Sequence, residues 1–442
     1  MQNLLARLWL QQRRSSALGL GIAAVLFLLC SGSAGWAATA ADNKPKPNPL
    51  EITTPDPLLP QPQVDRPLTP GEISQFRQAL DELNAQAAAQ LKAGNAPAAF
   101  EIWYRELRLR RSLGTVEEVE ALGRVGAIAW ENNQKLDLQI ITKRLQAIQD
   151  RAFGRTPEPK GKTPRQQTNL NGGKTEEIVL SSPVSAVDIK LLQALGQAYQ
   201  QIRLPAPALE DYQLLLADAR QRQDKATEEA MLKIIAQLHL NWFDYPKAAA
   251  TYEELLSFAT QQGDTVNQVV YLQQLTYIYD KAKQPENSLK VKQRLAESYL
   301  AINDLTQIPA LKIAIATDYE ALKQPDEASK NYQEAYNIAW SLQQFASASE
   351  ALKKLGDLYR TYKQPEYALQ VYQTLLQVER QSYDYYNLMK TYDQIGQIHL
   401  ERGDLAPAKA AFEQGLELAR SLKYQETYFA NQLARVTQQG SQ

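Results

Sequence analysis

The sequence predicts an all-α protein built as a solenoid of helical hairpins, and the main evidence is a repeat of 40 residues. The tripeptide Lys-Gln-Pro occurs three times at this spacing, at 283–285, 323–325 and 363–365. The residues around it repeat as well, in columns that run through six copies without an insertion or deletion. A fixed period of this length is typical of stacked-repeat architectures, in which each unit contacts only its neighbours.

The spacing of the columns predicts two helices per copy. A large aliphatic residue, a small residue and a ring share one helix face, as at Leu195, Gly196 and Tyr199. A small and an aromatic residue share a face of a second helix, as at Ala208 and Tyr212. The full aromatic column reads Tyr212, Tyr252, Lys292, Tyr332, Tyr372 and Phe412. We expect the small residues to let the paired helices approach closely, while the rings fill the space between neighbouring pairs.

Prolines and aspartates indicate where the helices begin. Prolines fall between the first and second helix of a copy, where a proline at the first helical position loses no hydrogen bond. They are Pro205, Pro285, Pro325 and Pro365. Aspartates recur at the other junction, where a carboxylate can cap the next first helix. They are Asp224, Asp264, Asp304 and Asp384.

The order of these columns resembles the tetratricopeptide repeat (TPR) superfamily. One copy that shows every feature contains Leu355, Gly356, Tyr359, Ala368 and Tyr372. The usual unit of that family has about 34 residues, and the longer unit here is similar to the extended repeats of kinesin-light-chain-type TPR proteins. The resemblance covers roughly 186–424. It implies a right-handed α-solenoid whose first helices line a concave groove that binds a partner.

The repeat frame extends more weakly toward the N-terminus, where we expect two divergent TPR-like hairpins in 71–150. The residues that match the frame are Ala87, Ala99, Trp103, Ala127 and Trp130. Gln139 and Lys143 depart from it, because they stand where the other copies have a small and an aromatic residue.

The first 40 residues have the layout of a signal peptide. Three arginines precede an uncharged apolar run, and the small residues at 38–40 offer a cleavage site near Ala40. The alternative is a retained membrane anchor, because 17–38 is just long enough to span a bilayer. Both alternatives predict export across a bacterial inner or thylakoid membrane, into the periplasm, envelope or lumen. Cys30 is the only cysteine, which excludes disulfide chemistry from a cleaved chain.

We divide the chain into six segments by these signals. They are a signal peptide or anchor (1–40), a Pro-rich linker (41–70), two divergent hairpins (71–150), a basic Pro/Gly-rich loop (151–185), six repeats (186–424) and a capping helix with a tail (425–442). The linker has nine prolines and is expected to be an extended spacer. Residues 151–174 hold six basic residues against one acid, which fits either a solvated loop or contact with an acidic partner or a membrane surface.

A search for catalytic or metal-binding groups returns no candidate. The two histidines, His239 and His399, stand in the ring column and are expected to pack in the core. Their number is too small for a His/Cys metal cluster. A Ser-His-Asp triad is disfavoured because it would need one of these two packed histidines. Gly172-Gly173-Lys174 lacks the other residues of a phosphate-binding loop. We therefore predict no enzyme activity, no cofactor and, from the near-neutral charge, no nucleic acid partner.

The exposed face of the first helices is the predicted partner-binding site, on residues carried over from the TPR resemblance. The set comprises Gln193, Gln197, Gln200, Lys233, Gln237, Gln273, Tyr277, Asp280, Lys353, Asp357, Arg360 and Gln397. Glutamine both donates and accepts hydrogen bonds, which suits the backbone of an extended peptide. The alternative is an inner face that is merely solvated, since glutamine is frequent throughout the chain.

Four tyrosines crowd the start of the last full copy. Tyr392 occupies a column that is mainly leucine and is expected in the core, whereas Tyr383, Tyr385 and Tyr386 cannot all face inward on one helix. Exposed aromatic residues are typical interface anchors. The segment 425–436 predicts a further helix that caps the open end of the stack.

These observations predict an exported, non-enzymatic scaffold or adaptor that binds another protein or peptide in its groove. The glutamine-rich style after a signal segment resembles cyanobacterial envelope or thylakoid-associated proteins, which implies a role in assembling or maintaining a membrane complex. Two alternatives stay open: an envelope hydrolase or polysaccharide-binding protein on a helical solenoid, and a self-assembling structural protein. The sequence fixes neither the partner nor the oligomeric state.

Overall fold

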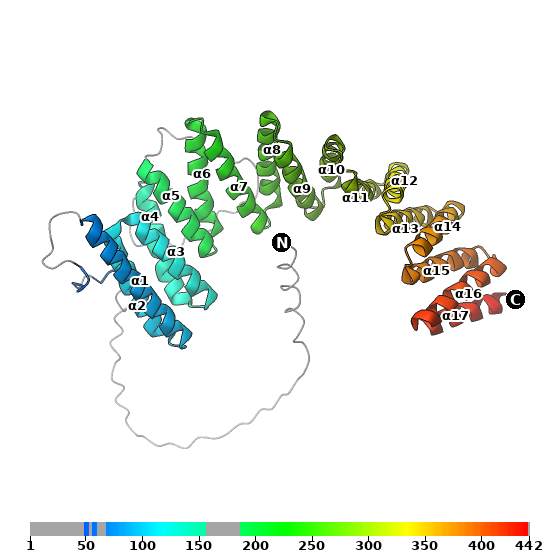
Figure 1. Cartoon of the computed structure of the whole chain (residues 1–442), viewed down its shortest axis with the longest axis horizontal. Helices are drawn as coiled ribbons and strands as arrows, with labels where there is room; N and C mark the ends of the chain where they lie inside the picture. The colour runs from blue at the N-terminus through cyan, green and yellow to red at the C-terminus, as the bar shows by residue number, and fades with distance from the viewer. Residues whose placement is uncertain (1–47, 53–54, 60–67, 156–185, 441–442) are drawn as a thin grey trace, which may run out of the picture. The chain divides into compact units, whose positions relative to one another are not determined.

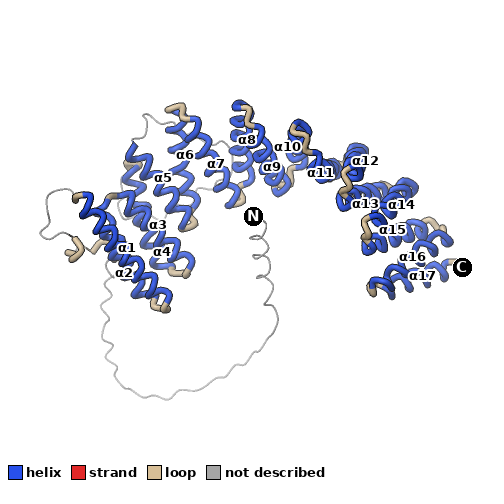
Figure 2. The backbone as a smooth tube through the Cα atoms, in the orientation of Figure 1, coloured by secondary structure: helices blue, strands red, loops and turns tan. Residues whose placement is uncertain are grey.

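The computed structural model describes residues 48–52, 55–59, 68–155 and 186–440, and these form an all-α stack of consecutive packed helices. Figure 1 shows the helices following one another in chain order, and Figure 2 shows only helices and loops in the described residues. The predicted signal or anchor, most of the Pro-rich linker and most of the basic loop lie outside the described residues. Within those ranges no helix combines the length and hydrophobicity needed to cross a bilayer.

The helices of the N-terminal part are α1 (Pro70–Lys92), α2 (Ala96–Arg110), the short 3₁₀ helix η1 (Arg111–Leu113), α3 (Thr115–Glu131) and α4 (Lys135–Ala152). The helices that follow residue 185 are α5 (Ala186–Gln201), α6 (Pro205–Gln221), α7 (Lys225–Asn241), α8 (Tyr245–Gln262), α9 (Thr265–Lys281), α10 (Pro285–Ala301), η2 (Leu305–Gln307), α11 (Ile308–Ala321), α12 (Pro325–Ser341), α13 (Phe345–Thr361), α14 (Pro365–Gln381), α15 (Tyr385–Glu401), α16 (Leu405–Leu422) and α17 (Glu426–Gln439).

The predicted capping roles are confirmed with one difference. Each of the four predicted prolines is the first residue of a second helix, namely of α6, α10, α12 and α14. The side chains of Asp224, Asp264 and Asp384 each accept a hydrogen bond from a backbone N–H at the start of α7, α9 and α15. Asp304 instead caps η2, by accepting from the N–H of Thr306, and α11 begins only at Ile308.

The turns share one backbone geometry, in keeping with the absence of insertions from the six copies. A residue with positive φ recurs every 20 residues, at Arg203, Gln223, Phe243, Gly263, Lys283, Asn303, Lys323, Gln343, Lys363, Tyr383, Gly403 and Lys423. In the α13–α14 turn, the N–H of Lys363 donates to the carbonyl of Arg360 (3.0 Å) and that of Gln364 to the carbonyl of Tyr359 (2.8 Å). This is the Schellman motif that closes many helices.

The small residues allow the close helix approach that the sequence predicts. A Cβ atom built on Gly356 would lie only 2.3 Å from the ring of Tyr372, and one on Gly396 would lie 2.6 Å from the ring of Phe412. The first helix of each of these hairpins therefore packs its backbone directly on an aromatic ring of the second. Contact between hairpins is polar as well as apolar, because the hydroxyl of Tyr319 accepts from Gln293 Nε2 at 3.1 Å.

The third copy departs from the apolar pattern. Lys292, in the aromatic column, is only 3% exposed, and its Nζ lies 2.9 Å from Asp280 Oδ1 and 2.9 Å from Asp318 Oδ2. Asp318 is also buried, at a place where the neighbouring copies have Ile278 and Leu358. Two core positions have thus exchanged apolar side chains for an ion pair.

The α3–α4–α5 junction is irregular. Elsewhere each second helix packs on the next first helix, but α5 packs mainly on α3 and makes little contact with α4. Glycines permit this contact, since a Cβ on Gly123 would lie 2.9 Å from Ala198 Cα and one on Gly126 would lie 2.4 Å from Ile202 Cγ2. The predicted departure of α4 from the repeat frame therefore has a structural counterpart.

The C-terminal helix α17 packs on α16, as expected for a cap. Phe429 is 1% exposed, and a Cβ on Gly415 would lie 2.2 Å from its ring. Val436 is also buried on this helix. The close approach of glycine and ring seen inside the hairpins is thus repeated at the end of the stack.

Candidate functional site

The predicted partner-binding residues lie on α5, α7, α9, α13 and α15, which are all first helices of hairpins. One row of this face is exposed on five consecutive first helices, at Gln197, Gln237, Tyr277, Thr317 and Asp357. Gln193 and Gln200 are half-buried on α5. The row therefore presents a mainly uncharged polar strip beside the buried core.

Several residues of the N-terminal half of the strip have contacts within their own hairpin. Lys233 Nζ lies 2.7 Å from Glu229 Oε1, and Gln237 Nε2 donates to Asn241 Oδ1 at 2.8 Å. Gln273 Nε2 donates to the hydroxyl of Tyr299 at 2.7 Å. Lys281 Nζ lies 5.5 Å from the centroid of the exposed Tyr277 ring. Apart from those of Gln273 and of Lys233, whose partner Glu229 is half-buried, these contacts join exposed groups within one helix, so a bound partner could exchange them at little cost.

Other predicted site residues stabilise the fold. Asp280 pairs with Lys292, and Asp357 Oδ1 accepts from the hydroxyl of Tyr372 at 2.7 Å. Arg360 donates to Gln394 and, at 3.2 Å, to Glu401. Gln397 Nε2 donates to the hydroxyl of Tyr428 at 3.2 Å, so α17 contacts the strip at its C-terminal end. These four residues have structural roles that sequence columns alone do not reveal.

Three exposed tyrosines stand at the start of α15, as the sequence predicts, and Tyr392 is buried. The ring centroids of Tyr386 and Tyr424 lie 5.7 Å apart, and Lys390 Nζ lies 4.1 Å from the ring centroid of Tyr386. A hydrogen bond from Lys390 lowers the pKa of the Tyr386 phenol below its ordinary value. Lys353 on α13 contributes to this lowering by its charge. The cluster of Tyr386, Tyr424, Lys390 and Lys353 thus offers aromatic and cationic groups at one end of the strip.

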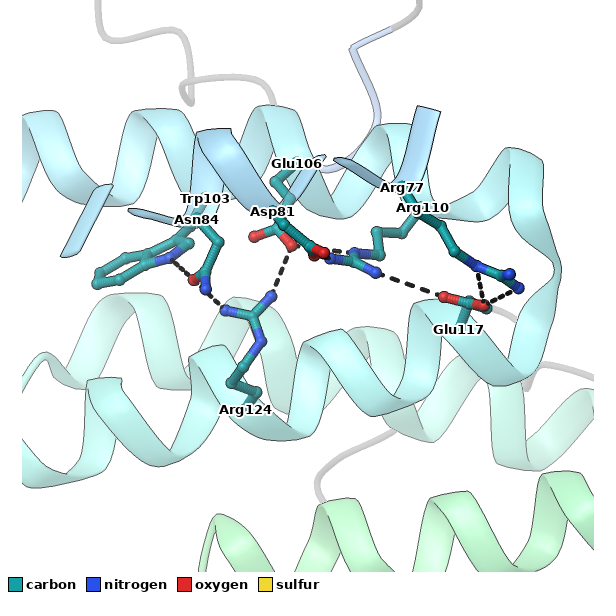
Figure 3. Close-up of polar contacts among 8 residues, drawn as sticks. All are labelled: Arg77, Asp81, Asn84, Trp103, Glu106, Arg110, Glu117 and Arg124. Carbon is teal, nitrogen blue, oxygen red and sulfur yellow. Dashed lines mark hydrogen bonds and ion pairs between the residues drawn. The ribbon is translucent and has the colours of Figure 1, made fainter. Parts of the chain in front are cut away.

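A polar network joins α1, α2 and α3 (Figure 3). At its centre Glu106, which is 0% exposed, accepts through Oε1 from Arg110 Nε at 3.0 Å and from Arg124 Nη2 at 2.6 Å. Arg124 also donates to Asn84, whose Oδ1 accepts from Trp103 Nε1 at 3.0 Å. The network continues through the pairs Arg110–Asp81, Arg110–Glu117 and Arg77–Glu117.

This network is a structural device rather than an acid–base site. Its carboxylates are engaged by guanidinium groups, which form strong bidentate or forked hydrogen bonds and stay protonated. Three arginines and three acids balance in charge. Figure 3 shows Arg124 reaching from α3 toward both Asn84 of α1 and Glu106 of α2, so one side chain holds three helices together.

The histidines pack as the ring column predicts. His239 is buried, and burial lowers its pKa below the ordinary value. His399 is half-buried, with Nδ1 at 3.3 Å from Asp404 Oδ2. The described ranges contain no group of three or more His, Cys, Asp or Glu residues that could hold a metal ion.

Besides Asp318, two other buried carboxyls in the stack have raised pKa values. Burial raises the pKa of Asp211 to about 8, and Gln149 Nε2 donates to its Oδ1 at 2.9 Å. Burial raises the pKa of Glu379 to about 7, and Thr391 Oγ1 donates to its Oε1 at 3.0 Å. The second oxygen of each has no hydrogen-bond partner within the described residues. Each lies in the packed interface between two helices, which favours a structural role.

We expect Asp211→Asn to stabilise the protein at alkaline pH by about 1–3 kcal/mol, because it removes a buried charge with an unpaired oxygen. The ordinary pKa of aspartate, 3.8, lies below the folded value of about 8. The folded state therefore binds more protons between these values, and stability falls as pH rises from about 4 to about 8. Urea unfolding at pH 5 and pH 9 would measure this. Equal stability of variant and parent at pH 9 would contradict it.

Sequence reasoning missed the network, the buried carboxyls and the Lys292 ion pair. A signal existed for the last, since Lys292 is the one exception in the aromatic column and Asp318 is the one acid in an aliphatic column. Glu106 offers a similar signal, because in the frame set by Trp103 it takes the place that Leu215 has in the first regular copy.

A comparison with known protein families agrees with the predicted helical repeat. The family model described as tetratricopeptide repeat matches residues 390–422, which span most of α15 and α16. No curated protein matches the sequence. Over residues 390–422 the family match agrees with the TPR resemblance predicted from the columns.

Several solved structures are similar to parts of the chain. BtubC (BKLC) from P. vanneervenii is 17% identical over 49% of this chain and 91% of its own, with a TM-score of 0.35. A kinesin light chain-like protein with nearly identical TPR-like repeats from Podosopora anserina is 12% identical over 44% and 97%, with a TM-score of 0.34. The apo form of the quorum sensor NprR from B. thuringiensis is 14% identical over 73% and 80%, with a TM-score of 0.31.

Proposed function

We propose that this chain is a tetratricopeptide repeat protein and acts as a non-catalytic scaffold that binds a partner protein or peptide on the exposed face of its first helices. TPR repeats generally mediate protein–protein interactions, and the family is typically non-enzymatic. The observation that carries the proposal is the exposed polar strip on consecutive first helices, at Gln197, Gln237, Tyr277, Thr317 and Asp357. A pre-formed strip loses little conformational entropy when it binds an extended segment.

The finer parts of this proposal rest on the sequence. Right-handed winding, a concave groove and a role in assembling or maintaining a membrane complex are proposed from the TPR resemblance and the style of the chain. Export is proposed from the arginines and the apolar run before residue 41. Cleavage near Ala40 would release the scaffold from the membrane, whereas retention of 17–38 would anchor it there.

Charge reversal on the strip should weaken partner binding. We expect Lys233→Glu with Lys353→Glu to reduce the recovery of cross-linked partners at least tenfold, because both exposed lysines lie on first helices of the strip. The parent chain and the variant would serve as baits in parallel, with quantitative mass spectrometry of the captured proteins. Thermal stability should hardly change, since exposed charges contribute little.

The matched control is Lys290→Glu with Lys330→Glu, which makes the same charge change on the exposed faces of the second helices α10 and α12. This control should capture partners as the parent does. Equal loss of partners in both double variants would indicate a general charge effect. Unchanged recovery in Lys233→Glu with Lys353→Glu would remove the strip as the binding site.

A further inference from the structure

An open pocket of about 410 Å³ lies at the irregular α3–α4–α5 junction, away from the strip on the first helices. It is lined by Trp130 at the end of α3, by one face of α4 and by Ile202 and Leu204 at the α5–α6 turn. The α4 residues that line it are Leu138, Gln139, Thr142, Lys143 and Gln146. This volume falls within the range of pockets that hold small organic ligands.

The pocket exists because two columns of the repeat are interrupted. Gln139 and Lys143 stand where the first regular copy has Ala208 and Tyr212, a small residue and a core ring. Both α4 side chains are exposed, whereas Tyr212 is only 2% exposed. The aromatic side chain that fills the interior of five of the six regular hairpins is therefore missing here, and α4 makes little contact with α5.

Trp130 has lost its covering neighbour for the same reason. It belongs to the ring column, in which Tyr199 is 0% exposed and Tyr279 is 7% exposed, yet Trp130 itself is 51% exposed. An indole left half open beside Leu138 offers apolar surface that a ligand can cover. Burial of such surface is the main source of affinity for apolar ligands.

The opposite wall gives the pocket its polarity. Lys143 is exposed and makes no ion pair with another residue that the structure describes, and no acid lines the pocket. Gln139, Thr142 and Gln146 add neutral hydrogen-bonding groups beside it. An anionic head group would meet one uncompensated ammonium there, while an apolar body would lie against Trp130 and Leu138.

We propose that this pocket binds an amphipathic carboxylate, in which an apolar chain occupies the space of the missing core ring and a carboxylate pairs with Lys143. The apolar wall of Trp130, Leu138, Ile202 and Leu204 sets the preference for the chain. The cationic side sets the preference for a carboxylate over a neutral or cationic head group. The ligand would also join α4 to the α5–α6 turn, since α4 has little direct contact with α5.

Titration of the full chain with decanoate, below the concentration at which it forms micelles, tests the proposal. We expect saturable binding with one site per chain by calorimetry, and a shift of tryptophan emission to shorter wavelength as Trp130 is covered. Decanol should bind roughly fivefold more weakly, because it lacks the ion pair with an exposed lysine. Absence of saturable decanoate binding, or equal affinity for decanol, would overturn the proposal.

Variants locate the site. Lys143→Glu should abolish decanoate binding and leave decanol binding unchanged, whereas Lys135→Glu, an exposed change on the same helix outside the pocket, should leave both unchanged. Trp130→Phe should remove the emission shift, while Trp242→Phe, at a tryptophan that is 49% exposed elsewhere, should keep it. Decanoate binding that survives Lys143→Glu, or an emission shift that survives Trp130→Phe, would place the ligand elsewhere and refute the assignment.

Discussion

Lys292→Ala should destabilise the third regular hairpin by roughly 3–5 kcal/mol, the range seen when one partner of a buried ion pair is removed. The lysine is 3% exposed and its Nζ bridges Asp280 and Asp318 at 2.9 Å each. Without it, Asp280 can turn to solvent because its side chain is 46% exposed, but Asp318 stays buried. Denaturant unfolding, with hydrogen exchange in α10 and α11 to locate the loss, would measure the effect.

The destabilisation should grow with pH. Burial already raises the pKa of Asp318 above its ordinary value, and Lys292 opposes that rise. Removal of the lysine raises the folded pKa further, so the folded state of the variant holds a proton that the unfolded state releases. Stability therefore falls as pH rises above the unfolded pKa near 3.9. A Lys292→Ala effect that is the same at pH 5 and pH 8 would contradict the buried-pair interpretation.

Restoring the repeat pattern at both positions should not destabilise the protein and should leave its stability equal to or above that of the parent chain. Lys292→Tyr with Asp318→Leu places the ring and aliphatic residue that the other copies have, and such replacement of a buried pair is neutral or stabilising by about 1–4 kcal/mol. Lys290→Ala, an exposed change on the same helix, is the matched control and should stay within about 0.5 kcal/mol. A double variant less stable than the parent chain would show that the pair contributes net stability.

The fold could be predicted from sequence because each column has one physical role. Ring and small residues meet at Gly356 and Tyr372, and prolines begin second helices wherever the column contains one. The turns were not predicted in detail, since the left-handed position is occupied by residues as different as Phe243, Lys283 and Gly403. Backbone geometry at that position is imposed by packing of the two helices and leaves little trace in residue type.

The candidate site could be predicted only as a surface. Column positions indicate which side chains leave the core, and Gln197, Gln237 and Tyr277 are exposed as expected. They do not indicate which exposed groups are already engaged, as Asp357 is by Tyr372. Such contacts join residues of different columns, so no single column carries their signal. Partner specificity depends on the same combinations, and for that reason it also cannot be read from the repeat.

The packing at the irregular α3–α4–α5 junction also could not be predicted from the sequence. Gln139 and Lys143 showed that α4 leaves the repeat frame, but not that α5 would pack on α3 through Gly123 and Gly126. A residue that departs from a column removes one contact without specifying the one that replaces it. The replacement depends on shape in three dimensions, which the 40-residue period does not encode.

Glu106→Ala should destabilise the N-terminal hairpins by roughly 3–5 kcal/mol, because it leaves two partly buried guanidinium groups without their shared acceptor. Glu106 is 0% exposed, and it accepts from Arg110 at 3.0 Å and from Arg124 at 2.6 Å. Arg110 keeps its pairs with Asp81 and Glu117, so we expect the loss of its bond to Glu106 to account for the smaller part of the destabilisation. Thermal and urea unfolding would measure the loss.

Two further variants distinguish whether the loss of stability comes from a stranded charge on Arg124 or from lost packing at position 106. Glu106→Leu places the aliphatic residue of the regular copies in the column but still strands Arg124, so it should be nearly as unstable as Glu106→Ala. Adding Arg124→Leu removes the stranded charge and should recover most of the loss, since a buried pair replaced as a whole is often neutral. Glu101→Ala, an exposed change on the same helix, should have little effect. If Glu106→Leu alone matched the parent chain, Arg124 would be satisfied by Asn84 and solvent, and its bond to Glu106 would not be what holds α3 to α2 (Figure 3).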